Sequence, residues 1–158
     1  SRATENFKYS ILDWLNLEFH YSFIHHHPRG TSSFTNLHRL EFEANPYWTL
    51  CNQSTIQIRN RYELNKSENN PVWQSIIRER FRWKFPIENC GKLTGIGFAN
   101  ELFYHINLRY FSQNRLVPLF LTFSLSEKVS LEVFTMVRNF YSGNKWYRSM
   151  VAGTNLEF

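Results

Sequence analysis

The sequence lacks any long hydrophobic run. Nowhere in its 158 residues does an apolar stretch approach the roughly 18 residues that a membrane-spanning helix needs. It also has no linker and no low-complexity segment, so we expect a single domain over residues 1–158. No secretory signal peptide is present, which leaves a cytoplasmic protein or a processed one. These absences exclude a helical membrane protein and a chain of several domains.

Basic residues are present but form no cluster. The net charge is +5, yet lysine and arginine gather neither in a tail nor on a helical face. We therefore expect no nucleic-acid partner. Lysine is scarce, with 6 residues against 12 arginines, and most arginines fall inside predicted strands. Because guanidinium groups are favoured where charges are confined and must share partners, we expect these arginines to face an enclosed polar space.

Helical periodicity is scarce, whereas apolar and polar residues alternate along nearly the whole chain. Residues 15–23 alternate without a fault, and residues 77–85, apart from Glu79, alternate between aromatic or aliphatic and basic side chains. The alternation predicts an all-β, antiparallel protein. We expect nine strands, at about 5–11, 15–23, 39–44, 56–64, 77–85, 93–103, 113–124, 129–140 and 147–158.

The last six residues, 153–158, run from a glycine through an apolar residue to a terminal aromatic. This ending resembles the C-terminal strand of Gram-negative outer-membrane β-barrels, in which a terminal Phe closes the last strand for the insertion machinery. The resemblance implies that Gly153, Leu156 and Phe158 form an assembly signal. It also implies that the outer-membrane assembly machinery binds this chain through its last strand.

The connections between the predicted strands fall into two kinds. Those around 12–14, Cys51, Cys90 and 126–128 are short, whereas 26–36, 65–72, 104–112 and 141–146 are mostly longer and more polar. Short periplasmic turns and longer outer loops are typical of outer-membrane barrels. A mean hydropathy of -0.45 fits such a barrel, since alternating strands are not hydrophobic on average. We predict an antiparallel transmembrane β-barrel, surrounded by lipid of the bacterial outer membrane.

Two features of this prediction remain open at this stage. Alternation alone does not say which face is inside, and a soluble lipocalin-like barrel would place the apolar face inward. Nine strands counted back from a periplasmic Phe158 would leave Ser1 outside the cell, whereas a barrel normally has an even number of strands. We therefore expect ten to twelve strands in the complete protein, with one or more N-terminal strands missing from this chain.

The polar face of the predicted strands is expected to form a network of ion pairs that fills a narrow lumen. Folding the 39–64 hairpin about Cys51 sets opposite charges beside each other across the strands. The predicted pairs are Arg39 with Glu63, Glu41 with Arg61, and Glu43 with Arg59. The strand at 77–85 has two predicted neighbours. Pairing with the strand at 56–64 places Arg78 beside Arg61, and pairing with the strand at 93–103 places Arg78 beside Glu101. In the pairing with the strand at 93–103, Arg80, Arg82 and Lys84 would lie beside Ala99, Gly97 and Gly95, respectively.

A filled lumen predicts a structural or accessory role rather than catalysis, because barrels of eight to twelve strands are largely filled by their own side chains. A narrow pore for small solutes is the alternative, followed by an enzyme whose histidines lie at the outer rim. We expect no catalytic residue, no cofactor and no metal site. Cys51 and Cys90 fall in predicted turns, where two unpaired thiols are favoured over a disulfide.

Five short motifs stand out along the predicted strands: His38-Arg39-Leu40-Glu41, Arg59-Asn60-Arg61-Tyr62-Glu63, Arg78-Glu79-Arg80-Phe81-Arg82, Asn100-Glu101-Leu102-Phe103 and Gln113-Asn114-Arg115-Leu116. These motifs resemble an uncharacterised outer-membrane family known as domain of unknown function 2490. The resemblance extends from about residue 15 to the end and implies a small barrel, frequent in Bacteroidota, with no established activity. A glycine usual in the seventh strand of that family is replaced around Val117-Pro118, and Pro118 removes a ladder donor there.

One acidic residue breaks the alternation. Glu79 lies on the face of its strand that carries Ile77 and Phe81, where lipid is expected. The predicted registers place Asn60 and Asn100 on either side of it. A position near the rim, or a bulge that turns Glu79 inward, would remove the conflict. Otherwise Asn60, Glu79 and Asn100 form a polar row that faces another protein, and we expect the chain to be a subunit of an outer-membrane complex.

Overall fold

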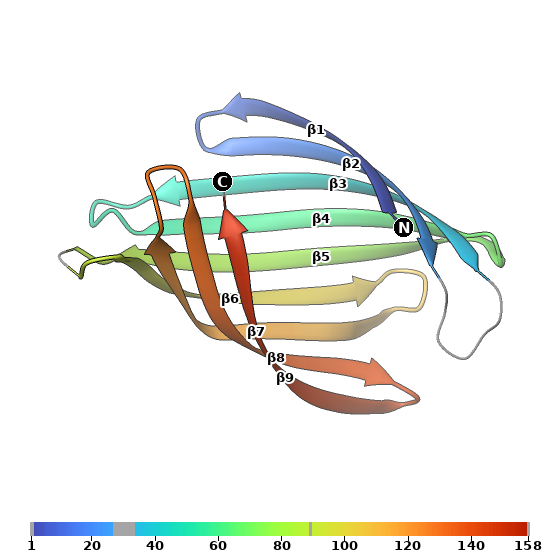
Figure 1. The fold of residues 1–158 in the computed structure, drawn as a ribbon. Coiled ribbons are helices and arrows are strands. Elements are labelled where there is room, and N and C mark those ends of the chain that lie inside the picture. The colour runs from blue at the N-terminus through green and yellow to red at the C-terminus, as the bar shows by residue number, and fades with distance from the viewer. Residues whose placement is uncertain (1, 27–33, 89, 158) are drawn as a thin grey trace. The chain divides into compact units, whose positions relative to one another are not determined.

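The computed structural model describes residues 2–26, 34–88 and 90–157. Nine β-strands account for most of these residues, as predicted (Figure 1). Among the described residues, no helix is long and apolar enough to cross a membrane. The strands are β1 (Arg2–Leu12), β2 (Leu15–His26), β3 (Thr35–Thr49), β4 (Thr55–Ser67), β5 (Asn70–Pro86), β6 (Leu93–His105), β7 (Tyr110–Ser124), β8 (Ser130–Ser142) and β9 (Lys145–Glu157).

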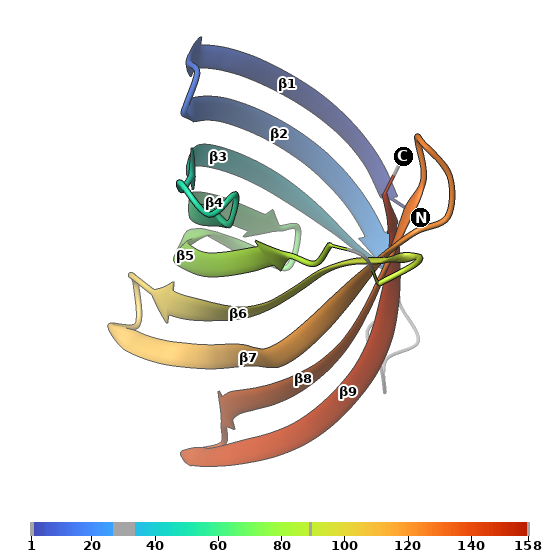
Figure 2. The same ribbon diagram turned by 90° about the vertical axis from the view of Figure 1, so that its left-hand side faces the viewer.

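The strands form one sheet in which each is hydrogen-bonded to the next along the chain. The pairs β1–β2, β2–β3, β7–β8 and β8–β9 are antiparallel, and their neighbouring strands can be followed in Figures 1 and 2. The expectation of a closed barrel is not met by these strands. β1 and β9 are the two ends of the hydrogen-bonded order, so each leaves one edge without a strand partner in the described sheet.

The chain divides into two compact units, which are described separately below. The first comprises residues 1–46, 59–79 and 103–110, and the second comprises residues 47–58, 80–102 and 111–158. The first unit therefore contains β1, β2 and most of β3. The second contains β7, β8 and β9 almost entirely.

Burial in this protein is the reverse of that in a water-soluble domain. Among the described residues, twelve buried side chains are polar or charged and only Phe103 and Phe120 are buried hydrophobic residues. On β3, Glu41 and Glu43 are 3% and 6% exposed, whereas Phe42 between them is 47% exposed. Charged residues are almost never fully buried unless they are paired. The buried polar side chains on strands thus belong to β2, β3, β4, β6, β7 and β8, whereas β1 is exposed on both faces.

The predicted difference in loop length is wrong for most connections. The turns at 68–69 and 143–144 have two residues each, as short as the turn at 13–14. The connections at 50–54, 87–92 and 125–129, predicted to be short, are longer than these. Alternation continues into the polar ends of β4 and β8, so polar sequence there marks strand ends rather than loops. The connection predicted at 26–36 lies largely outside the described residues.

A bulge in β7 explains the effect of Pro118. Leu116 lies opposite Val137 and Leu119 lies opposite Thr135, so Val117 and Pro118 together face one residue of β8. A bulge leaves a residue unpaired, so the backbone N–H that proline lacks is not needed there. The extra residue also reverses the alternation, so that the residues after the bulge point to the opposite face of the sheet from the one that the alternation before it predicts. As a result Phe120, only 1% exposed, lies on the buried polar face.

Candidate functional site

The buried polar face of the first unit is centred on Arg61 of β4. Its Nη1 atom lies 2.8 Å from Oε1 of Glu41 and 3.5 Å from Oε1 of Glu63, and its Nη2 atom is in ion contact with Glu43. The side chains of the three glutamates are at most 4% exposed. The guanidinium group of Arg61 therefore partly neutralises the negative charge of three buried carboxylates.

Two further arginines complete this cluster. Arg78 of β5 is in ion contact with Glu63 and lies over the ring of Phe103, 4.4 Å from its centroid. Arg39 of β3 donates from Nε to Asn65 Oδ1 at 2.8 Å. Buried charges cost several kcal/mol each unless they are paired, so these contacts are what allow the carboxylates to be buried.

The contacts correct the predicted register of β3 and β4. Glu68 N donates to Asn36 O at 3.1 Å, which sets Asn36 opposite Glu68. Counting along both strands from this pair places Arg61 opposite Glu43 rather than Glu41. The predicted contact of Arg61 with Glu41 forms, but as a diagonal contact. The connection contains a three-residue loop in which Gln53 has a φ of 60°, whereas the prediction folded the hairpin about Cys51.

The registers of β5 with its two neighbours also differ from the prediction by two residues. The two-residue turn at 68–69 sets Ser67 opposite Asn70, and Tyr62 Oη donates to Ser75 Oγ at 3.3 Å. On the other side Ile87 N donates to Thr94 O at 3.1 Å, which places Arg80 opposite Glu101 in the second unit. Arg78 therefore lies across from Phe103 rather than from Glu101, in agreement with the cation–π contact.

The second unit holds its own buried ion pairs. Arg82 of β5 is in ion contact with Glu132 of β8 and lies 4.5 Å from the centroid of the Phe120 ring. Arg115 Nη1 lies 3.5 Å from Glu101 Oε2. Arg138 Nη2 donates to Gln113 Oε1 at 3.3 Å. Of the predicted network, Arg59 in the first unit and Arg80 in the second are each half-buried.

Two glycines make room for this packing in the second unit. A Cβ on Gly97 would overlap the carbonyl oxygen of Trp83 and the ring of Phe120. A Cβ on Gly95 would lie 2.7 Å from Lys84 Cε. The prediction that small residues of β6 accommodate long side chains therefore holds at Gly95. At Gly97 the space is filled by Phe120, which the bulge in β7 turns inward.

The three candidate interface residues lie on the open apolar face. Asn60 and Glu79 are exposed, and Asn100 is half-buried. Their predicted alignment is wrong: Asn60 lies opposite Ile77 in the observed register, and Asn100 lies opposite Phe81. Because each register differs by two residues, all three side chains keep the predicted face but not a straight row. Asn60 donates from Nδ2 to the carbonyl of Ala44 at 3.4 Å.

In the second unit Asn100 belongs to a band of polar residues that the sequence did not reveal. Asn114 donates from Nδ2 to Asn100 Oδ1 at 3.2 Å, and it lies opposite Asn139 of β8. Asn139 in turn lies opposite Arg148 of β9, whose Nε donates to Asn139 Oδ1 at 3.0 Å. The register of three strands brings these residues together, and that register could not be read from alternation alone.

The predicted assembly signal is only partly described. Gly153 lies opposite Phe134, whose ring occupies the place of the missing side chain: a Cβ there would be 2.7 Å from Phe134 Cζ. Leu156 is 56% exposed on β9. Phe158 lies outside the described residues. Cys51 and Cys90 are free and exposed, in agreement with the prediction of unpaired thiols.

The histidines predicted near one end of the strands make separate contacts. His25 Nδ1 lies 2.6 Å from Asn36 Oδ1, and His38 Nδ1 lies 2.8 Å from Tyr21 Oη. His105 stacks on Tyr110 with ring centroids 5.4 Å apart. Ser22 is fully buried and contacts Arg2 and Thr4. These contacts hold the side chains in place and do not join them into one catalytic arrangement within the described residues.

The model of one protein family, described as "Protein of unknown function (DUF2490)", matches residues 5–149. No curated protein and no solved structure matches this chain.

Proposed function

This chain belongs to the DUF2490 family of proteins of unknown function, and we propose from its own residues that it is an outer-membrane β-barrel. Its proposed role is that of a structural or accessory subunit of an outer-membrane protein complex, without catalytic activity. The observation that carries the proposal is the reversed burial. Buried glutamates and half-buried arginines alternate with exposed aromatic and aliphatic side chains, a pattern that fits a lumen on one side and lipid on the other.

Aromatic residues at the strand ends support a membrane position. In the first unit Trp14, in the turn at 13–14, is 44% exposed, and Trp73, near the turn at 68–69, is 38% exposed. In the second unit the corresponding residues are Trp48 and Trp146, at 41% and 53%. Indole rings are favoured at the level of the lipid headgroups, where one end is apolar and the other is hydrated. Each unit thus carries Trp residues suited to both membrane surfaces.

The proposed barrel requires partners for the edges of β1 and β9. Unpaired backbone groups cost several kcal/mol each in hydrocarbon, so an open sheet edge is not stable there. We propose that one to three further strands pair with these edges, for a total of ten to twelve. The exposed Leu156 and the terminal Phe158 would serve the assembly machinery that inserts the barrel.

The packing of the polar face favours a structural role over a pore. In the first unit the side chains of Glu41, Glu63 and Arg61 are at most 15% exposed, and in the second unit the side chain of Glu132 is 8% exposed. Side chains that bury one another in this way leave little volume for a solute. Small barrels are commonly filled in the same manner.

Polar residues on the apolar face support a protein partner. Asn60 and Glu79 are exposed among apolar neighbours in the first unit, and Asn100, Asn114, Asn139 and Arg148 form a band in the second. A polar or charged group that faces lipid costs energy, whereas the same group can hydrogen-bond to a neighbouring protein. We propose that β4 to β9 dock against another outer-membrane protein.

Single cysteines at positions 60, 79 and 100 test this interface. In a chain whose Cys51 and Cys90 are replaced by serine, crosslinking in native membranes is expected to trap one protein from all three positions. Leu17→Cys is the matched control, because Leu17 is 38% exposed on the apolar face of β2, away from these strands. The interface proposal fails if positions 60, 79 and 100 react only with probes dissolved in the lipid phase.

A further inference from the structure

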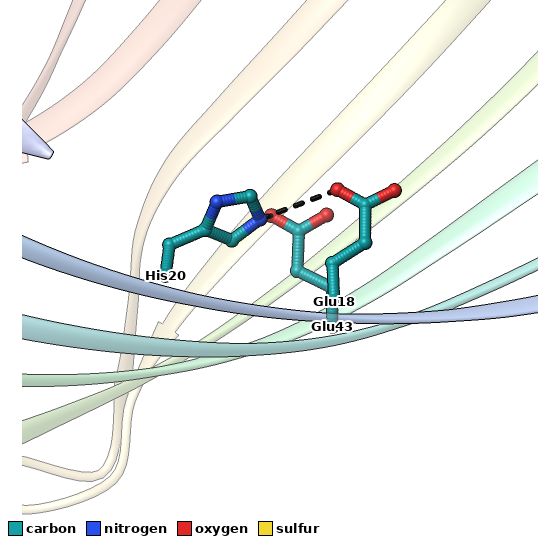
Figure 3. Close-up of side chains that lie close together, drawn as sticks. All are labelled: Glu18, His20 and Glu43. Atoms are coloured by element: carbon teal, nitrogen blue, oxygen red, sulfur yellow. Dashed lines mark ion pairs between the residues drawn. The ribbon is translucent and has the colours of Figure 1, made fainter. Parts of the chain in front are cut away.

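A cluster of metal-ligating side chains lies on β2 and β3, where Glu43 of the Arg61 cluster meets Glu18 and His20. Glu18 is directly opposite Glu43, and His20 follows Glu18 by two residues, so all three share one face. One ligand atom from each lies within 4.8 Å of the others. Figure 3 shows the imidazole nitrogen of His20 directed between the two carboxylates. His20 Nε2 is 3.3 Å from Glu18 Oε2 and 3.7 Å from Glu43 Oε1.

Asn6 of β1 orients the His20 ring. Asn6 lies opposite His20, and its Oδ1 atom is 2.6 Å from His20 Nδ1. Because a carbonyl oxygen only accepts hydrogen bonds, this contact requires a proton on Nδ1, in the neutral and in the charged ring alike. The lone pair of a neutral ring is then on Nε2, the atom that faces the carboxylates. That atom is buried and makes no hydrogen bond.

Neighbours also position the two carboxylates: Glu18 keeps Oε2 for His20, and Glu43 shares Oε1 between His20 and Arg61. Glu18 uses Oε1 for Lys8, whose Nζ is 3.8 Å away, and presents Oε2. Glu43 is 6% exposed, and its buried Oε1 atom makes no hydrogen bond, although it is in ion contact with Arg61. Arg61 also contacts Glu41 at 2.8 Å, so it keeps a partner if Glu43 turns towards a metal ion.

With a neutral His20 ring, Nε2 and the two carboxylate oxygens are acceptors that repel one another unless a cation lies between them. We propose that Glu18, His20 and Glu43 bind a Zn²⁺ ion. Zinc accepts imidazole nitrogen at about 2.0–2.1 Å and carboxylate oxygen at about 2.0–2.2 Å, so tetrahedral ligand atoms lie about 3.4 Å apart. The two observed separations, 3.3 and 3.7 Å, bracket this value.

The donor set distinguishes zinc from the common hard cations. Ca²⁺ and Mg²⁺ take six or more oxygen ligands, whereas the protein offers two carboxylates and one imidazole at this point. One nitrogen and two oxygens suit Zn²⁺ with a fourth position left to water. The hydrogen bond from His20 to Asn6 is the kind of outer contact that fixes the tautomer of a zinc-bound histidine.

This site goes beyond the proposed structural role and does not depend on a membrane, since it rests on contacts within β1, β2, β3 and β4. It also reverses the expectation from the sequence that the chain holds no metal. The reason is that Glu43 is separated from Glu18 and His20 along the chain. Only the pairing of β2 with β3 brings these residues together.

Zinc titration of the full chain in detergent, after treatment with a chelator, tests the proposal. One Zn²⁺ ion per chain is expected by equilibrium dialysis and elemental analysis. Co²⁺ in its place is expected to give the visible absorption of a four-coordinate ion. His20→Gln and Glu18→Gln should abolish one-to-one binding, and Asn6→Ala should weaken it about 10- to 100-fold, because it removes only the orienting hydrogen bond.

Two matched histidine variants and one folding check complete the experiment. His38→Gln, which alters a histidine bonded to Tyr21 on β2 and β3, should leave zinc binding unchanged. His25→Gln should do the same, and loss of binding in that variant would assign the metal to the 25–27 histidines instead. The circular dichroism of each variant reports whether the sheet is intact. Absence of bound zinc in the folded wild-type chain, or full binding in folded His20→Gln, would overturn the proposal.

Discussion

Arg61→Ala is expected to lower the free energy of unfolding by about 3–5 kcal/mol, since it removes one partner from a buried ion-paired group. Arg61 contacts Glu41, Glu43 and Glu63, and the side chains of these glutamates are 3–4% exposed. Without the guanidinium group the three carboxylates would be buried close together with less compensation. Urea unfolding in detergent micelles measures the loss, with Arg148→Ala as the control.

The control is informative because Arg148 is exposed and its hydrogen bond to Asn139 lies on the other face. A change at such a position usually stays within about 0.5 kcal/mol. A charge exchange sharpens the test: Arg61→Glu with Glu41→Arg should be less destabilising than Arg61→Glu alone, because the pair remains complementary. Equal losses in Arg61→Ala and Arg148→Ala would contradict the buried network.

Phe42→Arg is expected to cost about 2–4 kcal/mol in lipid vesicles, the range found for arginine at the bilayer midplane on the lipid face of a barrel. Phe42 is the eighth of the fifteen residues of β3, and it is 47% exposed on the apolar face. Its ring contacts Phe19, with centroids 5.1 Å apart. Phe42→Leu is the matched control, because it also removes the ring contact but adds no charge.

The difference between these two variants isolates the cost of the charge. In water an exposed arginine and an exposed leucine differ little in stability, commonly by less than about 0.5 kcal/mol. Urea unfolding in vesicles measures the free energy of unfolding of both variants. If the two values differ by no more than about 0.5 kcal/mol, the centre of β3 lies in water and not in lipid.

The sequence predicted the strands and their faces well because alternation has a period of two residues. β2 begins at the predicted Leu15 and β6 at the predicted Leu93. The same period hides the register, since a shift of two residues keeps every side chain on its face. Turn geometry fixes the register instead. Neither the left-handed Gln53 nor the two-residue turn at 68–69 had been recognised.

Contacts between distant strands were beyond the reach of sequence patterns. Arg82 meets Glu132, fifty residues away, and it also lies 4.5 Å from the ring centroid of Phe120, which the bulge at Val117 and Pro118 turns inward. The proline itself was recognised as an obstacle to pairing, but the resulting change of face was not. The predicted contrast between short and long loops failed because polar strand ends were taken for loops.

Membrane fractionation tests the central claim most directly. After carbonate extraction of cell envelopes, the protein is expected to remain in the outer-membrane fraction, since its exposed aromatic and aliphatic side chains would be embedded in lipid. A peripheral protein would be released by the same treatment. Recovery of the chain as a soluble monomer would contradict the account.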